Sequence, residues 1–417
     1  MMKKIVCIML MLLAPVSSAK NNGQKVQECT LQNGIKVVLH EDFKMPMVII
    51  GIVFHISKAD TPPNKFGLID IIGRELINSE LYDIFFSLGI NYLIGSNYFC
   101  IQIAASMNPK NARDFFAQMY KVMLDISVED LEIYKKQLAL KYKLSSYCGD
   151  DALSNNIAAN VRLSNGYTLP MFQEQELNSI TESDVKLFYR DNFCHCPVTV
   201  VVSGAIGYKS LLKILHNSLG NLPPRKRRSA ISLAPTSFNN VLLKNKFMSN
   251  TISYAYILSP DDNVKFGNFF DSLLRHEMIK YFNGIYPIVD CSVIDLLQNG
   301  CSIKLINMAQ ESYVSLEKLD DIYRAFIRRI CTLGISPESL ERIAAQKERY
   351  DLVISTDLEE VYSNMLYDSL SNRGVDGTYS SAEGMRAINL KEFRAFLEKF
   401  FQQNALFKIM TKFELDN

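Results

Sequence analysis

The sequence is poor in several features that mark common functional classes. It has no tryptophan and five histidines among 417 residues, so few imidazoles are available for metal or acid–base sites. The formal net charge of +1 gives no indication of binding to nucleic acid or to an anionic membrane surface. Beyond the first residues, no apolar run approaches the roughly 18 residues that a membrane span requires. With 48% hydrophobic and 21% charged residues, the chain has the composition of a globular protein.

The nine cysteines are scattered and do not have the density of a disulfide scaffold. The densest group is Cys194-His195-Cys196, in which both sulfurs would share one side of a strand. No second Cys/His cluster completes a tetrahedral metal site, and buried cysteines are common in protein cores. We therefore expect a structural role for this group, with a metal site as the alternative.

The first 19 residues have the pattern of a secretory signal peptide. Lys3 and Lys4 precede an apolar run over residues 5–13, and small residues follow at 17–19. The segment has no arginine, unlike a mitochondrial transit peptide. We expect export with cleavage after Ala19, and an uncleaved anchor is the alternative.

Strand and helix patterns alternate in blocks along the first half. Apolar and β-branched runs predict strands over residues 34–39, 47–54 and 197–202, the last closed by Ser203-Gly204. A period of 3.6 residues predicts helices over residues 66–88, 112–124, 128–144 and 182–189. This order is typical of an α+β domain, a mainly antiparallel sheet with helices on one face.

The same organisation recurs in the second half of the chain. The pattern S-x-E-x-L-E-x4-Q at residues 127–137 recurs at 336–346, an offset of 209 residues (336 − 127). The pattern I-x3-[DE]-x3-F-x4-F at residues 180–193 recurs at 388–401, an offset of 208 (388 − 180). Two separate matches at nearly the same offset predict two tandem homologous α+β domains.

A linker separates the two predicted domains. It contains a Pro-Pro pair, four consecutive basic residues (Arg225–Arg228) and small polar residues. We expect this basic run to be solvated, and a localisation or polyanion-binding patch is the alternative. The predicted organisation is a signal peptide at 1–19, an N-terminal domain at 20–219, the linker at 220–237 and a C-terminal domain at 238–417.

No motif in the chain forms a catalytic site by itself. His276-Glu277-Met278-Ile279-Lys280 is similar to the HExxH zinc helix, but lysine replaces the second histidine. No Gly-x-Ser-x-Gly nucleophile elbow occurs. The function therefore has to be sought in the domain organisation.

Further short motifs occur in a definite order. They are HEDxxxPxV at 40–48, FGL at 66–68, LGxN at 88–91, GDD at 149–151 and SG at 203–204. With the leader, the tandem repeat and the linker, they make the chain resemble the M16 (insulinase, or pitrilysin-like) peptidase family over nearly its whole mature length. The resemblance implies an M16/LuxS-like metallohydrolase-type fold.

Active M16 members carry HxxEH on their first helix, the inverted zinc motif. Its two histidines and a glutamate from a later helix hold zinc, and its own glutamate activates water. The resemblance places Asp70 at the first histidine, Gly73 at the glutamate and Arg74 at the second histidine. All three functions are lost, and Arg74 brings a fixed positive charge to the position of the metal.

The later ligand is missing as well. It should fall on the helix predicted over residues 128–144 or just beyond, but residues 133–172 contain no glutamate. We therefore expect no metal bound by this chain and no catalysis by it alone. Asp70 and Arg74 stand four residues apart, so we expect an ion pair of about 0.2–0.5 kcal/mol between them in place of the metal.

The second domain has a degenerate form of another family motif. In the family, the arginine and tyrosine of R-x3-G-L-x-Y contact substrate, and the nearest match here begins at Lys280 and ends at Tyr286. Lysine replaces arginine and lacks its planar fork, and the tyrosine comes one residue early. The resemblance makes Lys280 and Tyr286 the candidate substrate-binding residues.

The resemblance implies a non-catalytic M16-like subunit. We expect it to be exported to the periplasm of a Gram-negative-type bacterium and to pair with an active M16 zinc peptidase subunit, which would supply the zinc. The two chains would form a chamber that degrades extended peptides. The alternatives are a free-standing exported peptide-binding scaffold and a divergent zinc metallopeptidase.

Overall fold

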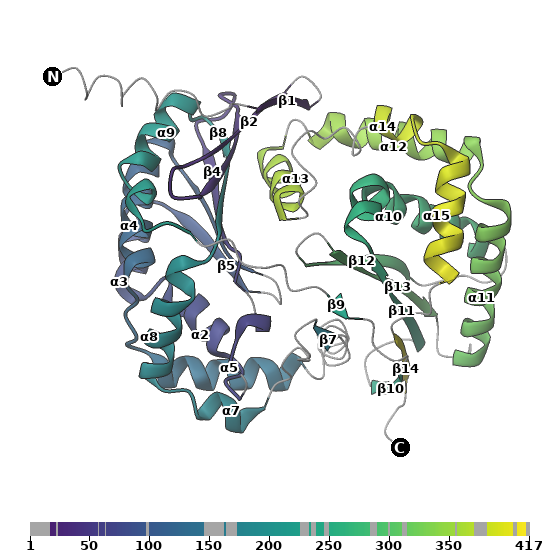
Figure 1. Ribbon diagram of the computed structural model, residues 1–417, viewed down its shortest axis with the longest axis horizontal. Coiled ribbons are helices and arrows are strands. Elements are labelled where there is room, and N and C mark those ends of the chain that lie inside the picture. The colour runs from purple at the N-terminus through teal and green to yellow at the C-terminus, as the bar shows by residue number, and fades with distance from the viewer. Residues whose placement is uncertain are drawn as a thin grey trace.

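The protein folds around two large β-sheets, one in each half of the chain (Figure 1). The structure, a computed structural model, describes residues 17–21, 24–56, 58–62, 64–96, 100–145, 162–163, 173–225, 233–234, 239–245, 250–283, 290–298, 301–310, 315–354, 357–370, 382–402 and 407–413.

The first sheet has seven strands in the order β1-β2-β3-β8-β4-β6-β5. β3 and β8 are parallel, and all other neighbours are antiparallel. The strands are β1 (Ser17–Asn21), β2 (Gln24–Thr30), β3 (Lys36–Glu41), β4 (Val48–Phe54), β5 (Asn91–Ser96), β6 (Ile101–Met107) and β8 (Val198–Gly204).

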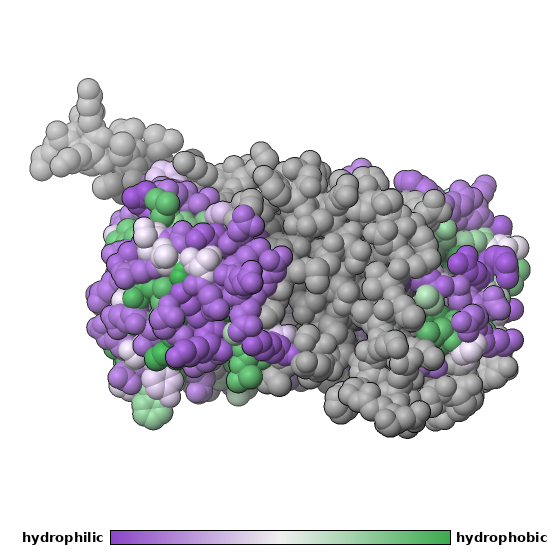
Figure 2. Space-filling model, turned by 90° about the horizontal axis from the view of Figure 1, so that it is seen from below, coloured by the Kyte–Doolittle hydropathy of each residue, from purple (hydrophilic) through white to green (hydrophobic). Residues whose placement is uncertain are grey.

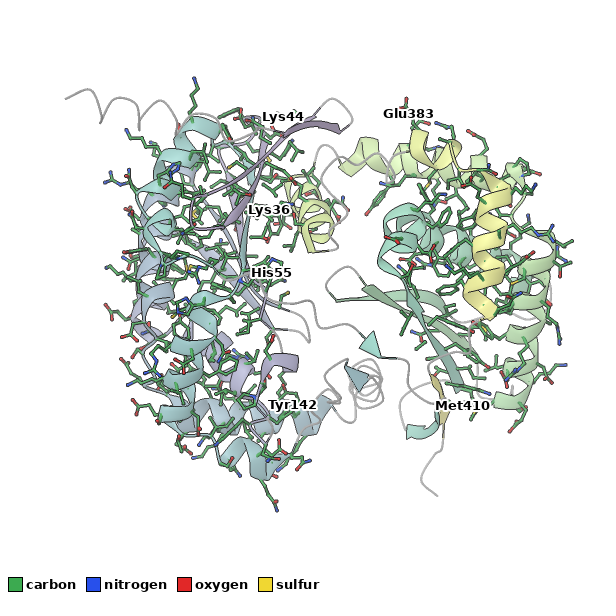
Figure 3. The ribbon with its side chains drawn as sticks, viewed as in Figure 1. Lys36, Lys44, His55, Tyr142, Glu383 and Met410 are labelled. Carbon is green, nitrogen blue, oxygen red and sulfur yellow. The ribbon has the colours of Figure 1, made fainter. Side chains whose placement is uncertain are left out.

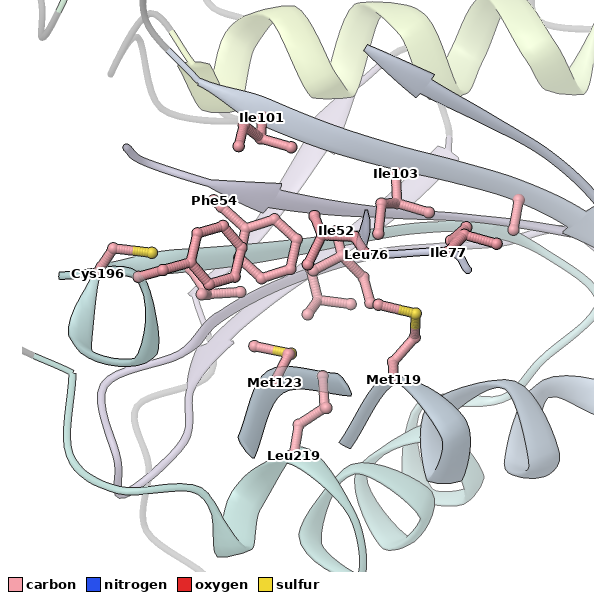
Figure 4. Packing of buried hydrophobic residues seen from close by; sticks show 14 of the residues in the cluster. Ile52, Phe54, Leu76, Ile77, Ile101, Ile103, Met119, Met123, Cys196 and Leu219 are labelled. Atoms are coloured by element: carbon pink, nitrogen blue, oxygen red, sulfur yellow. The ribbon is translucent and has the colours of Figure 1, made fainter. Parts of the chain in front are cut away.

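Helices of the first half pack on one face of this sheet. Their apolar side chains meet those of the strands in one core, in which Phe54, Leu76 and Met119 are fully buried (Figure 4). The helical segments are η1 (Lys58–Asp60), α2 (Leu68–Glu75), α3 (Ser79–Ser87), η2 (Pro109–Asn111), α4 (Ala112–Leu124), α5 (Leu131–Ser145), α7 (Glu174–Asn178), α8 (Glu182–Asp191), η3 (Phe193–His195), α9 (Tyr208–His216) and η4 (Leu219–Asn221).

The second sheet has five strands in the order β10-β14-β11-β13-β12. Its core is rich in phenylalanine, including Phe270, Phe396 and Phe400. The strands are β10 (Asn239–Asn245), β11 (Asn250–Leu258), β12 (Asp290–Gln298), β13 (Cys301–Gln310) and β14 (Phe407–Phe413). The helices of this half are α10 (Pro260–Asn283), α11 (Leu316–Leu333), α12 (Pro337–Ile354), α13 (Leu358–Leu370), α14 (Ala382–Arg386) and α15 (Leu390–Gln402).

The two sheets repeat one topology. The order β3-β8-β4-β6-β5 corresponds strand by strand to β10-β14-β11-β13-β12, and the first pair of each series is parallel. The first repeated sequence pattern marks the starts of α5 and α12, and the second marks those of α8 and α15. The predicted α+β fold with two tandem homologous domains is therefore confirmed.

The prediction of one helix over residues 66–88 is wrong. The structure has two helices, α2 and α3, with a break at residues 76–78. The side chain of Asn78 accepts a hydrogen bond of 2.9 Å from the backbone N–H of Leu81 and so begins a new helix. Apolar periodicity continues across the break, which is why it did not reveal the cap.

The first residue of the basic run is not solvated as expected. Arg225 is half-buried, its backbone N–H donates to the carbonyl of Asn33 at 2.8 Å, and its guanidinium donates to the carbonyl of Cys194. Within the predicted linker, strand β9 (Leu233–Ala234) pairs with β7 (Arg162–Leu163). Residues 226–232 and 235–238 lie outside the described part of the chain.

Helix α13 of the second half covers the other face of the first sheet (Figure 1). Its residues Leu358, Tyr362 and Met365 are buried against side chains of that face, which include those of Val38 and Val201. Every residue of β4 and β8 is consequently buried, which explains their continuous apolar sequences. The expectation of helices on one face alone is therefore incomplete for this sheet.

Exposed large apolar side chains are scattered over the described part of the surface. In the coloured part of Figure 2, hydrophilic residues predominate and hydrophobic residues form small, scattered groups. Among the exposed large side chains are those of Tyr82, Phe86 and Leu93, on α3 and β5. No helix in the described ranges is long and apolar enough to cross a bilayer.

Replacing Gly51 with alanine tests the contact between α13 and the sheet. A Cβ atom at Gly51 would lie 2.2 Å from the hydroxyl oxygen of Tyr362. The tyrosine ring or α13 would have to shift, so we expect the free energy of unfolding to fall by about 1–3 kcal/mol in chemical denaturation.

Gly73→Ala is the matched control for Gly51→Ala. A Cβ atom at Gly73 would meet only ordinary contacts, 3.9 Å from side-chain carbons of Ile101 and Ser96. This substitution should be neutral or should stabilise the helix by up to about 1 kcal/mol. Equal losses for the two variants would contradict the proposed contact.

Candidate functional site

Helix α2 begins at a position that requires glycine. Gly67 precedes the helix with φ of 91°, and a Cβ atom there would lie 2.6 Å from Leu177 Cδ1. Leu68, Ile69, Ile71 and Ile72 are fully buried in the core of the first half. The helix is therefore held firmly against the sheet, and its polar residues have defined positions.

The carboxylate of Asp70 is buried, with 3% of the side chain exposed, and contacts three polar groups. Ser96 Oγ of β5 donates to Oδ1 at 2.6 Å, and the Tyr142 hydroxyl of α5 donates to Oδ2 at 2.7 Å. Lys58 Nζ of η1 lies 3.3 Å from Oδ2 and forms an ion pair with it. Figure 3 labels Tyr142 in the lower part of the N-terminal half, and Figure 1 shows its helix α5 beside α2.

Lys58 is bound by more than the carboxylate. Its Nζ donates to the Tyr142 hydroxyl at 2.8 Å and lies 5.1 Å from the centre of the Tyr142 ring and 6.0 Å from that of Phe66. Aromatic faces attract cations at such distances. The ammonium is thus surrounded by a carboxylate, a phenol oxygen and two rings.

The expected ion pair between Asp70 and Arg74 is wrong. The partner of Asp70 is Lys58, and Arg74 is exposed. The short aspartate side chain is buried between α2, α5 and β5, whereas the long arginine side chain keeps its charge in water. The spacing of four residues describes the helix alone and leaves out the lysine that approaches from another segment.

The three degenerate positions do not fit a zinc ion. Gly73 has no side chain, Arg74 has no lone pair to donate, and the Asp70 oxygens are already bound by Ser96, Tyr142 and Lys58. Within the described residues, no group of three or more His, Cys, Asp or Glu side chains could hold a metal. Helix α5, expected to supply the later ligand, reaches Asp70 with the phenol of Tyr142.

Glu75 is a residue of this helix that sequence reasoning missed. It is 3% exposed, and neither carboxylate oxygen has a well-formed hydrogen bond in the described part of the chain. Burial, with the nearby charge of Asp130, raises its pKa to about 7. Burial of Glu75 could have been predicted from its position, because residues 68, 71, 72 and 75 share the apolar side of the helix.

The other predicted site residues are only partly placed. Lys280 lies on α10, is exposed, and donates from Nζ to Ser339 Oγ at the start of α12 at 3.3 Å. Tyr286 lies outside the described residues, so the pair is not brought together here. Their role in substrate binding stays a prediction.

The Cys194-His195-Cys196 segment is not a strand. Residues 193–195 form the turn η3, which places Cys196 in the core and Cys194 half-buried, with its sulfur 3.7 Å from the carbonyl of Leu124. Neither cysteine forms a disulfide bond within the described part of the chain. The structural interpretation of this group agrees with these positions.

Three solved structures share the architecture of this chain. A protease from Helicobacter pylori is 10% identical, with a TM-score of 0.77, and the match covers 93% of this chain and all of that one. An inactive M16 peptidase domain from Pseudomonas fluorescens is 12% identical, with a TM-score of 0.77, and the match covers 94% and 99% of the two chains. The periplasmic protease PqqL from Escherichia coli is 15% identical, with a TM-score of 0.72, and the match covers 94% of this chain but 48% of PqqL.

Comparison of the sequence with known families and curated proteins gives no match. No protein-family model matches it, and no curated protein matches it. At these identities the structural likeness describes the fold, and the predicted M16-like peptidase fold is confirmed.

Metal removal should leave the protein unchanged. Because the positions around Asp70 do not fit zinc, we expect the purified chain to contain no stoichiometric metal. Its melting temperature should change by less than about 1 °C after dialysis against a chelator, since a chain that binds no metal has none to lose. Elemental analysis and calorimetry check this, and loss of zinc together with a fall in melting temperature would contradict it.

Glu75 should make stability depend on pH. The native state keeps the Glu75 proton up to a pKa of about 7, whereas the ordinary value is 4.5. Stability should therefore fall as pH rises from about 4.5 to 7. Glu75→Gln cannot ionise, so it should equal the wild type near pH 4.5 and exceed it by about 1–3 kcal/mol at pH 8 in denaturant titrations.

Glu80→Gln, at an exposed position of α3, is the control for this measurement. It should leave the pH profile of the wild type unchanged. A Glu75→Gln variant that keeps the wild-type profile would show that this carboxyl does not titrate between the two values.

Proposed function

We propose that this chain is a non-catalytic M16-like subunit that pairs with a separate, zinc-bearing M16-like chain. One observation supports the proposal: the described residues form two repeated α+β units, while Asp70, which the family resemblance places at the first histidine of the zinc motif, is paired with Lys58. The same resemblance places Gly73 at the motif glutamate and Arg74 at the second histidine.

The structural neighbours support the proposal that this chain is half of a larger assembly. The chain spans about half the length of PqqL, since the match covers 48% of that protease. A neighbour from Pseudomonas fluorescens is itself an inactive M16 domain. A chain of this kind would need its catalytic half from another molecule.

The subunit would contact extended peptides through the edge of its first sheet. β5 is the last strand of that sheet, so one side of its backbone is not paired with another described strand. Leu93 of β5 is 77% exposed and offers an apolar contact beside this edge. An extended peptide can add to such an edge by main-chain hydrogen bonds, with side-chain contacts giving specificity. Lys280 and Tyr286 would contribute from the second domain.

Export to the periplasm is part of the proposal. The leader supports it, and PqqL is a periplasmic protease. The backbone of residues 17–21 pairs with β2 as strand β1, with Ala19 opposite Val26 and Lys20 opposite Lys25. Cleavage after Ala19 would therefore divide β1 and leave two of its residues on the mature chain.

Co-expression with an M16-like chain that carries HxxEH tests the pairing. The partner to choose is one encoded beside this chain in the same genome. We expect a stable heterodimer on size exclusion that cleaves peptides, because this half completes the peptide-binding surface. Replacing the motif glutamate of the partner should abolish activity. Separate elution, with a partner equally active alone, would contradict the proposal.

Leu93→Lys in the same complex tests the peptide edge. It should raise KM about tenfold, which corresponds to a loss of roughly 1.4 kcal/mol of peptide-binding free energy. Assembly of the two chains should not change. Leu187→Lys, at an exposed leucine of α8, is the matched control and should leave KM unchanged. Equal effects of the two variants would exclude this edge and leave the pairing untouched.

A further inference from the structure

We infer that Lys58 is a built-in cation that takes the structural place of a metal ion under helix α2. The inference concerns the chain alone and does not depend on the proposed pairing. The carboxylate of Asp70 is removed from water, with 3% of its side chain exposed. A buried carboxylate is costly unless it is paired and hydrogen-bonded.

Lys58 balances this charge in the same place. Its side chain is 11% exposed, and its Nζ lies 3.3 Å from Asp70 Oδ2. The pair carries no net charge, and the two rings beside the ammonium add cation–π attraction. The carboxylate and the ammonium thus lie together inside the protein.

The hydrogen bonds around the pair have the direction that an ammonium requires. Ser96 and Tyr142 donate their protons to Asp70, and the Tyr142 oxygen accepts from Lys58. The Tyr142 oxygen and Asp70 Oδ2 present lone pairs to Nζ, and the ammonium meets them with its protons. The Tyr142 hydroxyl, in turn, has its own proton directed at the carboxylate, so each of these protons points at an acceptor.

The cluster joins four elements that are distant in sequence. Lys58 comes from η1, Asp70 from α2, Ser96 from β5 and Tyr142 from α5. These contacts connect the first helix, the edge strand and a later helix of the same domain. The ammonium therefore holds these elements together, and the chain supplies this cation itself.

Removing the ammonium should destabilise the domain through the unpaired carboxylate. Lys58→Ala should lower the melting temperature by about 5–10 °C, since breaking a buried ion pair leaves one charge uncompensated. Lys186→Ala is the control, because Lys186 forms an exposed ion pair with Glu182 on α8 and such pairs contribute little. It should lower the melting temperature by less than about 2 °C.

The double variant Lys58→Ala/Asp70→Asn separates charge pairing from lost packing. If Lys58 acts as a counter-charge, removing both charges should recover at least half of the lost melting temperature. If the single variant does not fold but the double variant does, the inference holds. A double variant no more stable than Lys58→Ala, or equal effects of Lys58→Ala and Lys186→Ala, would overturn it.

Chemical rescue then identifies the kind of cation. Ethylammonium chloride should raise the melting temperature of Lys58→Ala above that in sodium chloride of equal ionic strength, because it can bind in the vacated space. It should not do so for the wild type, Lys186→Ala or the double variant. Rescue by micromolar zinc, with none by ethylammonium, would show a metal site and overturn the inference.

Discussion

The region around α2 depends on one requirement, that the buried carboxylate of Asp70 has a positive charge beside it. Lys58 meets this requirement, and Ser96 and Tyr142 complete the hydrogen bonds of the carboxylate. Because the four residues come from four elements, satisfying one carboxylate restrains a helix, an edge strand and a second helix together. The ammonium of Lys58 can therefore hold these elements together as a cation supplied by the chain itself.

A second constraint connects the two halves of the chain. The first sheet has helices on both faces because α13 of the second half packs against β4 and β8. Helix α13 approaches the sheet closely at Gly51, because a side chain at this position would collide with the ring of Tyr362. That ring is buried, its hydroxyl has no hydrogen-bond partner among the described residues, and burial raises its pKa to about 12. Contact between the halves here is thus apolar and tightly packed.

Much of the fold could be predicted because its signals are local. The helix over residues 112–124 and the strand ending at Gly204 follow directly from periodicity and turn residues. The tandem repeat could also be predicted, since both halves keep the residues that start the corresponding helices. The break at Asn78 was missed because a single capping side chain, hidden in a continuous apolar pattern, decided it. The prediction for Arg225 was wrong because a basic run does not indicate which of its residues will bind a backbone carbonyl elsewhere in the domain. Here the guanidinium of Arg225 donates to the carbonyl of Cys194.

For the candidate site, the sequence by itself determined what is missing: Asp70, Gly73 and Arg74 are not the two zinc-binding histidines and the water-activating glutamate of the motif that the resemblance places there. Only the tertiary structure decided which cation lies beside Asp70. Arg74 was the nearest cation along the chain, yet Lys58, twelve residues before Asp70 (70 − 58), is the cation that reaches the buried oxygen. Spacing along a helix describes which side chains share a face. The burial of a charge, and therefore its partner, is decided by the segments that pack against that face from elsewhere in the chain.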